Sequence, residues 1–218
     1  MARAHDAIAR NKRFTVALSG GSTPKALYSE LAGSKFRDLP WGNICFFWGD
    51  ERHVPPDHSD SNYRMTREAL LSKVPVPPQN IFRIKAEGKD PEAVAQDYER
   101  TLRTFFHLEK DQLPRFDLVL LGLGTDGHTA SLFPGTDALK ENERLVLAYW
   151  VESMKTNRIT LTLPVLNNAA CDMFLVSGKE KAQRVREILD ESKDFPAGMV
   201  RPADGTLLWM MDRAAAGK

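Results

Sequence analysis

Phe14–Leu31 has the sequence FTVALSGGSTPKALYSEL. Its first part, Phe14–Ser19, is a short run of apolar and β-branched residues and predicts a strand. Apolar residues then recur at helical spacing and predict a helix over Pro24–Ala32, with Thr23 as its N-cap and Pro24 at its first position. A strand joined directly to a helix is the repeating unit of parallel sheets, so this stretch indicates an α/β fold.

The same alternation continues along the rest of the chain. Further strands are predicted at Ile44–Gly49, Phe116–Leu121, Leu145–Val151, Arg158–Leu163, Asp172–Ser177 and Leu207–Met210, with a weaker one at Ile81–Ile84. Helices are predicted at Ser61–Leu71, Asp90–Leu108 and Lys179–Leu189. Several of these strands are apolar throughout, which is typical of a sheet covered on both faces. We therefore expect one α/β domain over residues 1–218 with a mainly parallel sheet.

Composition narrows the possible classes of protein. The chain has 218 residues, 42% of them hydrophobic and 27% charged, with a formal net charge of +1. This balance is typical of a folded globular chain and lacks the basic surplus of a nucleic-acid-binding protein. Its apolar runs are too short to span a membrane, and Met1–Arg13 has no apolar signal-peptide core. Cys45 and Cys171 lie in or beside apolar runs, so we expect two buried reduced thiols and a cytoplasmic protein.

In parallel sheets, ligands bind beyond the carboxyl ends of the strands, so the loops that follow strands deserve most weight. The first such loop is Ser19-Gly20-Gly21-Ser22-Thr23, between the first strand and its helix. Glycines, hydroxyls and a helix N-terminus together favour phosphate binding. The loop lacks the Lys-Ser/Thr ending of a Walker motif. A tight turn with a good helix cap is the structural alternative.

The second loop, Trp48–Pro56, contains Asp50, Glu51 and Arg52 directly after a strand. These side chains are suited either to polar substrate contacts or to ion pairs within a solvated loop. Three residues of metal-ligand type lie in or beside it, but no second cluster with zinc-like spacing accompanies them: His53, Asp57 and His58. We therefore expect no metal site here.

The third loop, Gly122–Thr129, matches G-x-G-x-x-G. In a dinucleotide-binding unit a long helix follows this motif, whereas here Pro134 and Gly135 interrupt the chain after a few residues. The loop better suits a histidine base, His128, because imidazole can take a proton from water near neutral pH. A carboxylate could orient the ring, and the sequence leaves three candidates open: Asp50, Glu51 and Asp126. A purely structural histidine is the alternative.

Two further basic residues lie at predicted element ends, where a phosphate dianion could bind. Arg158 begins a predicted strand, and Lys181 lies in the first turn of the predicted helix at Lys179–Leu189. Either could instead be an ordinary surface charge. Lys179 is a second candidate for the phosphate contact.

Several segments together resemble a known family. ALSGGSTPKALYSEL, WGDERHVPPDHSDSNYRM and LGLGTDGHTASLFPGT, followed by RITLTLPVLNNA, FLVSGKEKAQRV and LLWMMDRAA, are similar in order and spacing to 6-phosphogluconolactonases. The resemblance runs from about Phe14 to Arg213. It implies a Rossmann-like three-layer α/β sandwich of the sugar-phosphate isomerase/deaminase type. It also implies hydrolysis of 6-phospho-D-glucono-1,5-lactone in the pentose phosphate pathway, without a metal or organic cofactor. We expect a monomer or weak dimer.

The resemblance also implies roles for individual residues. His128 is similar to the family's catalytic base, and Asp50 and Arg52 to its active-site acid and arginine, with Asp126 as a further catalytic candidate. The implied sugar-phosphate contacts are Ser19, Gly20, Gly21, Ser22, Thr23, Arg158 and Lys181.

Glucosamine-6-phosphate deaminases are the main alternative, because they share these loops. They typically continue the third loop as GHIAFNEPG, where a glutamate assists ring opening, whereas this chain has GHTASLFPG with Phe133 near that position. An apolar side chain cannot perform that acid–base step. A non-catalytic sugar-phosphate sensor on the same fold is a second alternative. Compared with family members, residues 1–13 provide only one short helix before the first strand, so we expect a short N-terminus.

Overall fold

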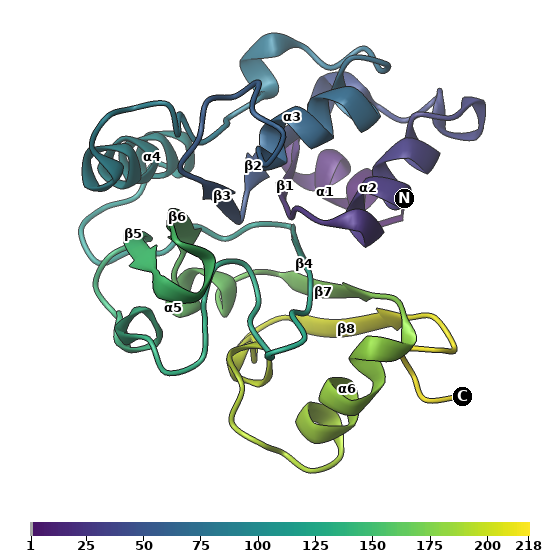
Figure 1. Ribbon diagram of the computed structural model, residues 1–218. Helices are drawn as coiled ribbons and strands as arrows, with labels where there is room; N and C mark the ends of the chain where they lie inside the picture. The colour runs from purple at the N-terminus through teal and green to yellow at the C-terminus, as the bar shows by residue number, and fades with distance from the viewer. Residues whose placement is uncertain (1) are drawn as a thin grey trace.

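A five-stranded parallel sheet organises the molecule, and the computed structural model describes residues 2–218 (Figure 1). The strand order is β2-β1-β4-β7-β8, and all four neighbouring pairs are parallel. The strands are β1 (Phe14–Leu18), β2 (Ile44–Trp48), β4 (Leu118–Leu121), β7 (Cys171–Val176) and β8 (Thr206–Met211). Every residue of β1 and β2 is buried, as expected for strands covered on both faces.

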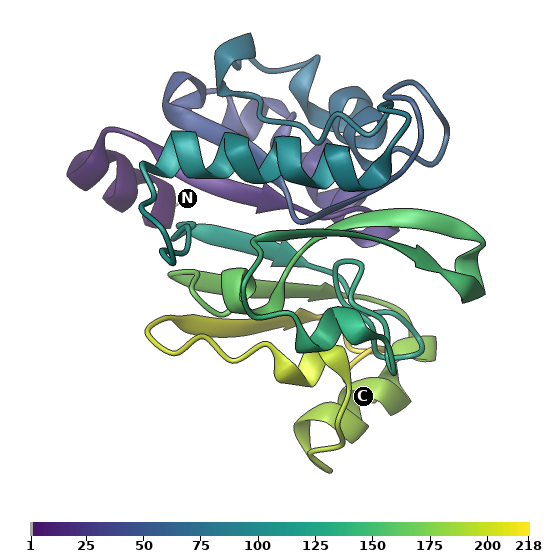
Figure 2. The same cartoon turned by 90° about the vertical axis from the view of Figure 1, so that its left-hand side faces the viewer.

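Helices lie on both sides of this sheet, which makes three layers (Figure 2). They are α1 (Ala2–Asn11), α2 (Ser22–Leu31), α3 (Asn62–Thr66), α4 (Pro91–Phe106), α5 (Leu163–Leu166) and α6 (Ala182–Leu189). A π-helical turn at Arg67–Leu71 extends α3, and a 3₁₀ turn at Lys179–Lys181 precedes α6. The expected α/β sandwich with a mainly parallel sheet is confirmed. None of the helices among residues 2–218 is both long and apolar enough to cross a bilayer.

A second, antiparallel sheet of three strands differs from the expectation of one parallel sheet. It has the order β3-β6-β5 and consists of β3 (Asp50–Arg52), β5 (Val146–Val151) and β6 (Thr156–Leu161). Only four residues separate β5 from β6, which is too short for a parallel crossover and allows only a hairpin. β3 lies in what the sequence indicated as a loop, because its pairing partner β6 is more than 100 residues away.

Some predicted boundaries were wrong for local reasons. The predicted strand at Ile81–Ile84 is reduced to a single bridge, from Ile81 to Phe46. Helix α2 begins at Ser22 with Gly21 as its N-cap, so Thr23 lies inside the helix and not before it. Gly21 has φ of 101°, a conformation that glycine adopts without strain. Both cysteines are free and buried, as predicted.

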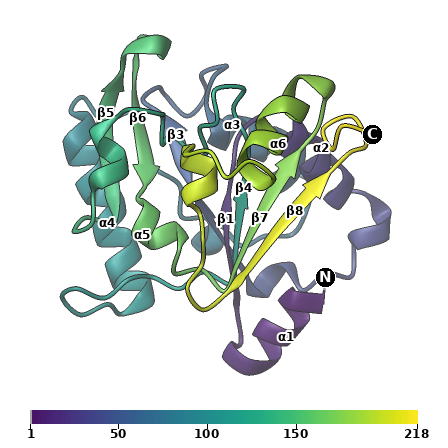
Figure 3. The same ribbon diagram turned by 90° about the horizontal axis from the view of Figure 1, so that it is seen from below.

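The carboxyl ends of β1, β4 and β7 meet at one edge of the parallel sheet, as the views from the side and from below show (Figure 3). The three glycine-containing loops that follow these strands therefore lie side by side. β3 continues from β2 at the same edge, which adds Asp50 and Arg52 to the group. Parallel pairing thus brings together residues that are far apart in the sequence.

Candidate active site

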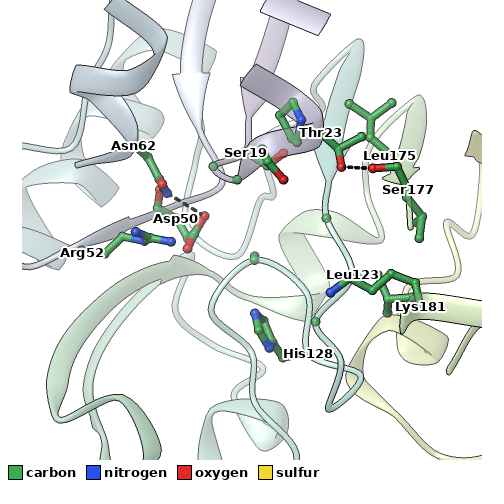
Figure 4. Close-up of a pocket in the computed structure, with 18 residues that line it drawn as sticks. Ser19, Thr23, Asp50, Arg52, Asn62, Leu123, His128, Leu175, Ser177 and Lys181 are labelled. Carbon is green, nitrogen blue, oxygen red and sulfur yellow. Dashed lines mark hydrogen bonds between the residues drawn. The ribbon is translucent and has the colours of Figure 1, made fainter. Parts of the chain in front are cut away.

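A pocket of about 240 Å³ lies at this edge of the sheet. It is lined by the loops after β1, β4 and β7, by β3, and by one residue of α3. Figure 4 shows Asn62, Asp50 and Arg52 on one side of the view, and Thr23, Ser177 and Lys181 on the other. His128 lies between these two groups in the view, and all seven residues line the pocket.

The loop after β1 presents backbone to one end of the pocket. Helix α2 starts within this loop, so its first N–H groups have no partner inside the helix and the positive end of its dipole lies at the pocket. The Tyr28 hydroxyl donates to the Ser19 carbonyl at 2.9 Å and accepts from the Ser19 N–H at 3.1 Å, which holds the start of the loop. The Thr23 and Ser177 hydroxyls lie 2.7 Å apart. With the Lys181 ammonium nearby, this end is suited to a phosphate group.

The loop after β4 forms hydrogen bonds within itself and fixes the position of the His128 side chain. The Gly124 N–H donates to the His128 carbonyl at 2.8 Å, and the Gly127 N–H donates to the Gly124 carbonyl at 3.0 Å. His128 Nδ1 lies 2.6 Å from Asp126 Oδ1, so Asp126, and not Asp50 or Glu51, is the carboxylate that orients the ring. Among residues 2–218, no protein group engages His128 Nε2. The ring therefore presents one nitrogen to the pocket and the other to a carboxylate.

The environment of this pair favours an ionised Asp126. Partial burial acts to raise the pKa of Asp126, but the neighbouring His128 charge and hydrogen bonds outweigh burial and lower that pKa below its usual value. On its other side the His128 ring stacks on Phe133, with ring centroids 4.3 Å apart and planes at 29°. Gly124 lies directly beneath the pair, and a Cβ there would collide with both the imidazole and the carboxylate. A larger residue here would force the pair to shift.

Asp50 is buried, and neutral donors hold both of its carboxylate oxygens. Ser131 donates its hydroxyl to Oδ2 at 2.7 Å, and the Asn62 amide donates to Oδ1 at 3.2 Å. Ser131 lies three residues after His128, so Asp50 also holds the end of the loop after β4 that carries His128 (the histidine loop). Glu51 faces the other way and accepts hydrogen bonds at the start of α3 from the backbone of Asn62 and Tyr63. Glu51 thus has a structural role, and burial raises its pKa.

Arg52 lines the pocket, whereas Arg158 does not. The two residues are directly opposite each other in the antiparallel pairing of β3 with β6. Arg158 is 8% exposed, and its pKa is lowered first by burial and then by the nearby Arg52 charge. Arg158 does not begin its strand as predicted, because it is the third residue of β6. Residues directly opposite each other in an antiparallel pair point to the same face of the sheet, so the Arg158 side chain lies beside that of Arg52, and its contact with the phosphate stays a prediction. The carboxylates of Asp50, Glu51 and Asp60 act on the Arg158 pKa in the opposite direction.

The structure brings most of the predicted site residues to one pocket. Those that line it are Ser19, Gly20, Gly21, Ser22, Thr23, Asp50, Arg52, His128 and Lys181. Asp126 does not line the pocket but contacts His128, which does. Lys179 is exposed and lies outside the pocket. Sequence analysis missed Asn62 and Ser177. Asn62 belongs to the DHSDSNYRM segment that resembles the family, and Ser177 directly follows the strand at Cys171–Val176, where ligand contacts are expected. Both residues could therefore have been proposed from the sequence.

The residues considered as metal ligands do not gather. His53 Nε2 lies 2.6 Å from the Gly88 carbonyl, and the nearest charged neighbour of His58 is Asp60, at 3.9 Å. Across residues 2–218, no group of three or more histidine, cysteine or acidic side chains could hold a metal ion. The loop at Gly122–Thr129 is followed by turns and not by a helix, so it lacks the helix N-terminus that a dinucleotide-binding loop provides.

The fold and the pocket together define a sugar-phosphate isomerase/deaminase type of protein, and comparison with known proteins identifies the family. A family model described as glucosamine-6-phosphate isomerases/6-phosphogluconolactonase matches residues 1–209. The chain belongs to this family. The 6-phosphogluconolactonase of Synechocystis is 46% identical over 212 residues, covering 96% of this chain and 86% of the relative. The rat 6-phosphogluconolactonase is 42% identical and covers 94% and 80%.

Solved structures agree with this assignment. The 6-phosphogluconolactonase of Trypanosoma brucei superposes with a TM-score of 0.85 at 32% identity, covering 99% of this chain and 90% of that one. The Thermotoga maritima 6-phosphogluconolactonase gives 0.83 at 33% identity, covering 97% and 91%. A monomeric glucosamine-6-phosphate deaminase gives 0.81 at 21% identity, covering 99% and 93%, which shows only that the fold is shared.

Proposed function

We propose that this protein hydrolyses 6-phospho-D-glucono-1,5-lactone to 6-phospho-D-gluconate, with His128 as the general base. The observation that carries the proposal is the Asp126–His128 pair, with Nδ1 held at 2.6 Å and Nε2 left for a water molecule. An oriented imidazole beside an ionised carboxylate is suited to removing a proton from water. The names of the relatives support the same substrate.

The reaction would proceed in two steps. His128 Nε2 takes a proton from water as its oxygen bonds to C1 of the lactone, and the negative charge moves to the carbonyl oxygen. Arg52, or N–H groups of the glycine loops, would stabilise that oxyanion. The bond from C1 to the ring oxygen then breaks, and protonated His128 returns the proton to the ring oxygen. His128 is neutral again once it has given up this proton, and the carboxylic acid of the product loses its own proton to solvent to become the carboxylate.

The phosphate end of the pocket would position the lactone. Lys181, Thr23, Ser177 and the N-terminus of α2 would bind the phosphate, and this remote binding energy orients C1 against the histidine. Asp50 would act through the groups that it holds, because its two oxygens already accept hydrogen bonds from Ser131 and Asn62. The stacking of Phe133 on His128 supports lactone hydrolysis over deamination, since this side chain offers no acid–base group.

The test measures two activities on one preparation of the protein. Loss of freshly prepared 6-phosphogluconolactone is followed above its spontaneous rate, and ammonia release from glucosamine 6-phosphate is followed in parallel. We expect accelerated lactone hydrolysis without ammonia. Ammonia release would instead indicate a deaminase. Thermal stabilisation by 6-phosphogluconate without turnover of either compound would indicate a sugar-phosphate sensor.

A further inference from the structure

Arg184 connects helix α6 to the histidine loop. It follows Lys181 by three residues, so the two side chains leave neighbouring turns of the same helical segment. Lys181 faces the pocket, whereas Arg184 faces the histidine loop and donates Nε–H to the Thr125 carbonyl at 3.0 Å. The residue that accepts this bond directly precedes Asp126.

Two other partners fix the Arg184 guanidinium in place. Its Nη1 donates to the Glu187 carboxylate at 2.6 Å, and its central carbon lies 3.9 Å from the centre of the Phe195 ring. Its side chain is 21% exposed. A planar guanidinium can donate in two directions and stack on a ring at once, whereas a lysine ammonium cannot. The contact with Thr125 is therefore held by geometry as well as by charge.

The histidine loop is supported from the same side at a second point. The Phe195 ring packs against Gly127, where a Cβ would lie 2.6 Å from the ring, and the Ala197 N–H donates to the Gly127 carbonyl at 3.1 Å. Arg184 and Phe195 thus hold the two residues that flank Asp126. No helix follows this loop to fix it. These contacts add to the hydrogen bonds that the loop makes within itself, and they act on both neighbours of Asp126.

We propose that Arg184 is a positioning residue for the lactonase reaction, acting by holding the Asp126–His128 loop at its Thr125 carbonyl. The proposal rests on the proposed function and adds a residue that touches no substrate. Removing Arg184 leaves Glu187 with other partners, because Gln183 lies 3.2 Å and Lys193 3.3 Å from its Oε1. The helix should therefore stay folded while the loop loses its anchor.

The experiment compares Arg184→Met with Arg186→Met. Arg186 is on the same helix and also forms an ion pair, with Glu191 at 3.1 Å, but its side chain is 64% exposed and contacts no residue of the loop. We expect kcat for the phosphorylated lactone to fall about 10-fold in Arg184→Met with KM within about twofold, because a small displacement of a reacting group is costly. Arg186→Met should match the wild type, and Arg184→Lys should recover only part of kcat.

A second readout does not depend on turnover. NMR spectra of protein with ¹⁵N-labelled histidine report the ring nitrogens of His128 directly. Arg184→Met should shift or broaden the His128 ring signals, while Arg186→Met leaves them unchanged. If the wild-type protein is active and Arg184→Met keeps both the wild-type kcat and the wild-type His128 signals, the positioning role is overturned. Wild-type protein that fails to hydrolyse the lactone would instead overturn the proposed function, and the NMR comparison would still decide whether Arg184 holds the loop.

Discussion

Two glycine-rich loops at the same edge of the sheet perform different tasks. The loop after β1 continues directly into α2 at Ser22, so the N–H groups at the start of this helix remain open to a ligand. The loop after β4 closes hydrogen bonds within itself, from Gly124 to His128 and from Gly127 to Gly124, and presents a side chain instead. Both are rich in glycine and both follow a buried parallel strand.

The residues that follow each loop account for the difference. After Gly21 the chain has two hydroxyl residues and then Pro24 in the first turn of α2, where its missing N–H costs the helix no hydrogen bond, so the N-terminus of the helix stays open at the pocket. After Gly127 the chain reaches Phe133, Pro134 and Gly135 before any helix can form. A glycine motif by itself therefore does not indicate whether backbone or side chain will contact the ligand. We expect the loop after β4 to control kcat and the loop after β1 to control KM.

The largest effect is expected when the histidine loop loses His128, the proposed base. His128→Ala should lower kcat about 10²- to 10⁴-fold, the usual contribution of general base catalysis, with a much smaller change in KM. Steady-state kinetics with 6-phosphogluconolactone, corrected for spontaneous hydrolysis, measure both constants. A variant that keeps wild-type kcat would show that another group activates the water.

A similar but smaller effect should follow from adding one carbon beneath the same pair. In Gly124→Ala the new Cβ would collide with the His128 ring and the Asp126 carboxylate, so the pair must shift and kcat should fall about 10²-fold. Gly42→Ala is the matched control, because no heavy atom lies within 4 Å of its Cβ and it is remote from the pocket. If Gly124→Ala raises KM and spares kcat, the loop binds substrate and does not hold the base.

The phosphate end should respond in the opposite way. Lys181→Met removes one charged hydrogen-bond donor and should raise KM for the phosphorylated lactone about 10- to 100-fold, with kcat little changed. The same substitution at Lys179, which is exposed outside the pocket, should leave KM unchanged and so decides between the two lysines. Unphosphorylated gluconolactone should not distinguish Lys181→Met from the wild type. A selective loss of kcat would contradict the assignment of this end.

Features of this fold that depend on local interactions could be predicted from the sequence, whereas those that depend on pairing between distant segments could not. Strand, turn and helix signals are local, so the glycine loop, the capped helix α4 and the His128 loop could all be located in advance. β3 could not, because Asp50–Arg52 becomes a strand only by pairing with β6 from the distant part of the chain. For the same reason the pairing of Arg158 opposite Arg52 could not be predicted. The choice of Asp126 as partner of His128 required the loop's own fold, which sequence spacing left open.

The smallest effect concerns how each strand end is held. Tyr28 and Tyr98 each use the hydroxyl to hold one backbone residue, by donating to its carbonyl and accepting from its N–H. Tyr28 holds Ser19 after β1 in this way, and Tyr98 holds Trp48 at the end of β2. Tyr28→Phe and Tyr98→Phe should each destabilise the protein by about 1–3 kcal/mol, because two buried backbone groups lose their partner. Thermal or urea unfolding measures this loss.

The two variants should differ in kinetics, because only one of the held residues belongs to the phosphate end. Ser19 lines the pocket and Trp48 does not, so Tyr28→Phe should raise KM a few-fold whereas Tyr98→Phe should leave KM unchanged at equal loss of stability. Equal KM values in the two variants would mean that the loop after β1 keeps its shape without the tyrosine. The open N–H groups of that loop would then owe their position to Gly21 and the start of α2 alone.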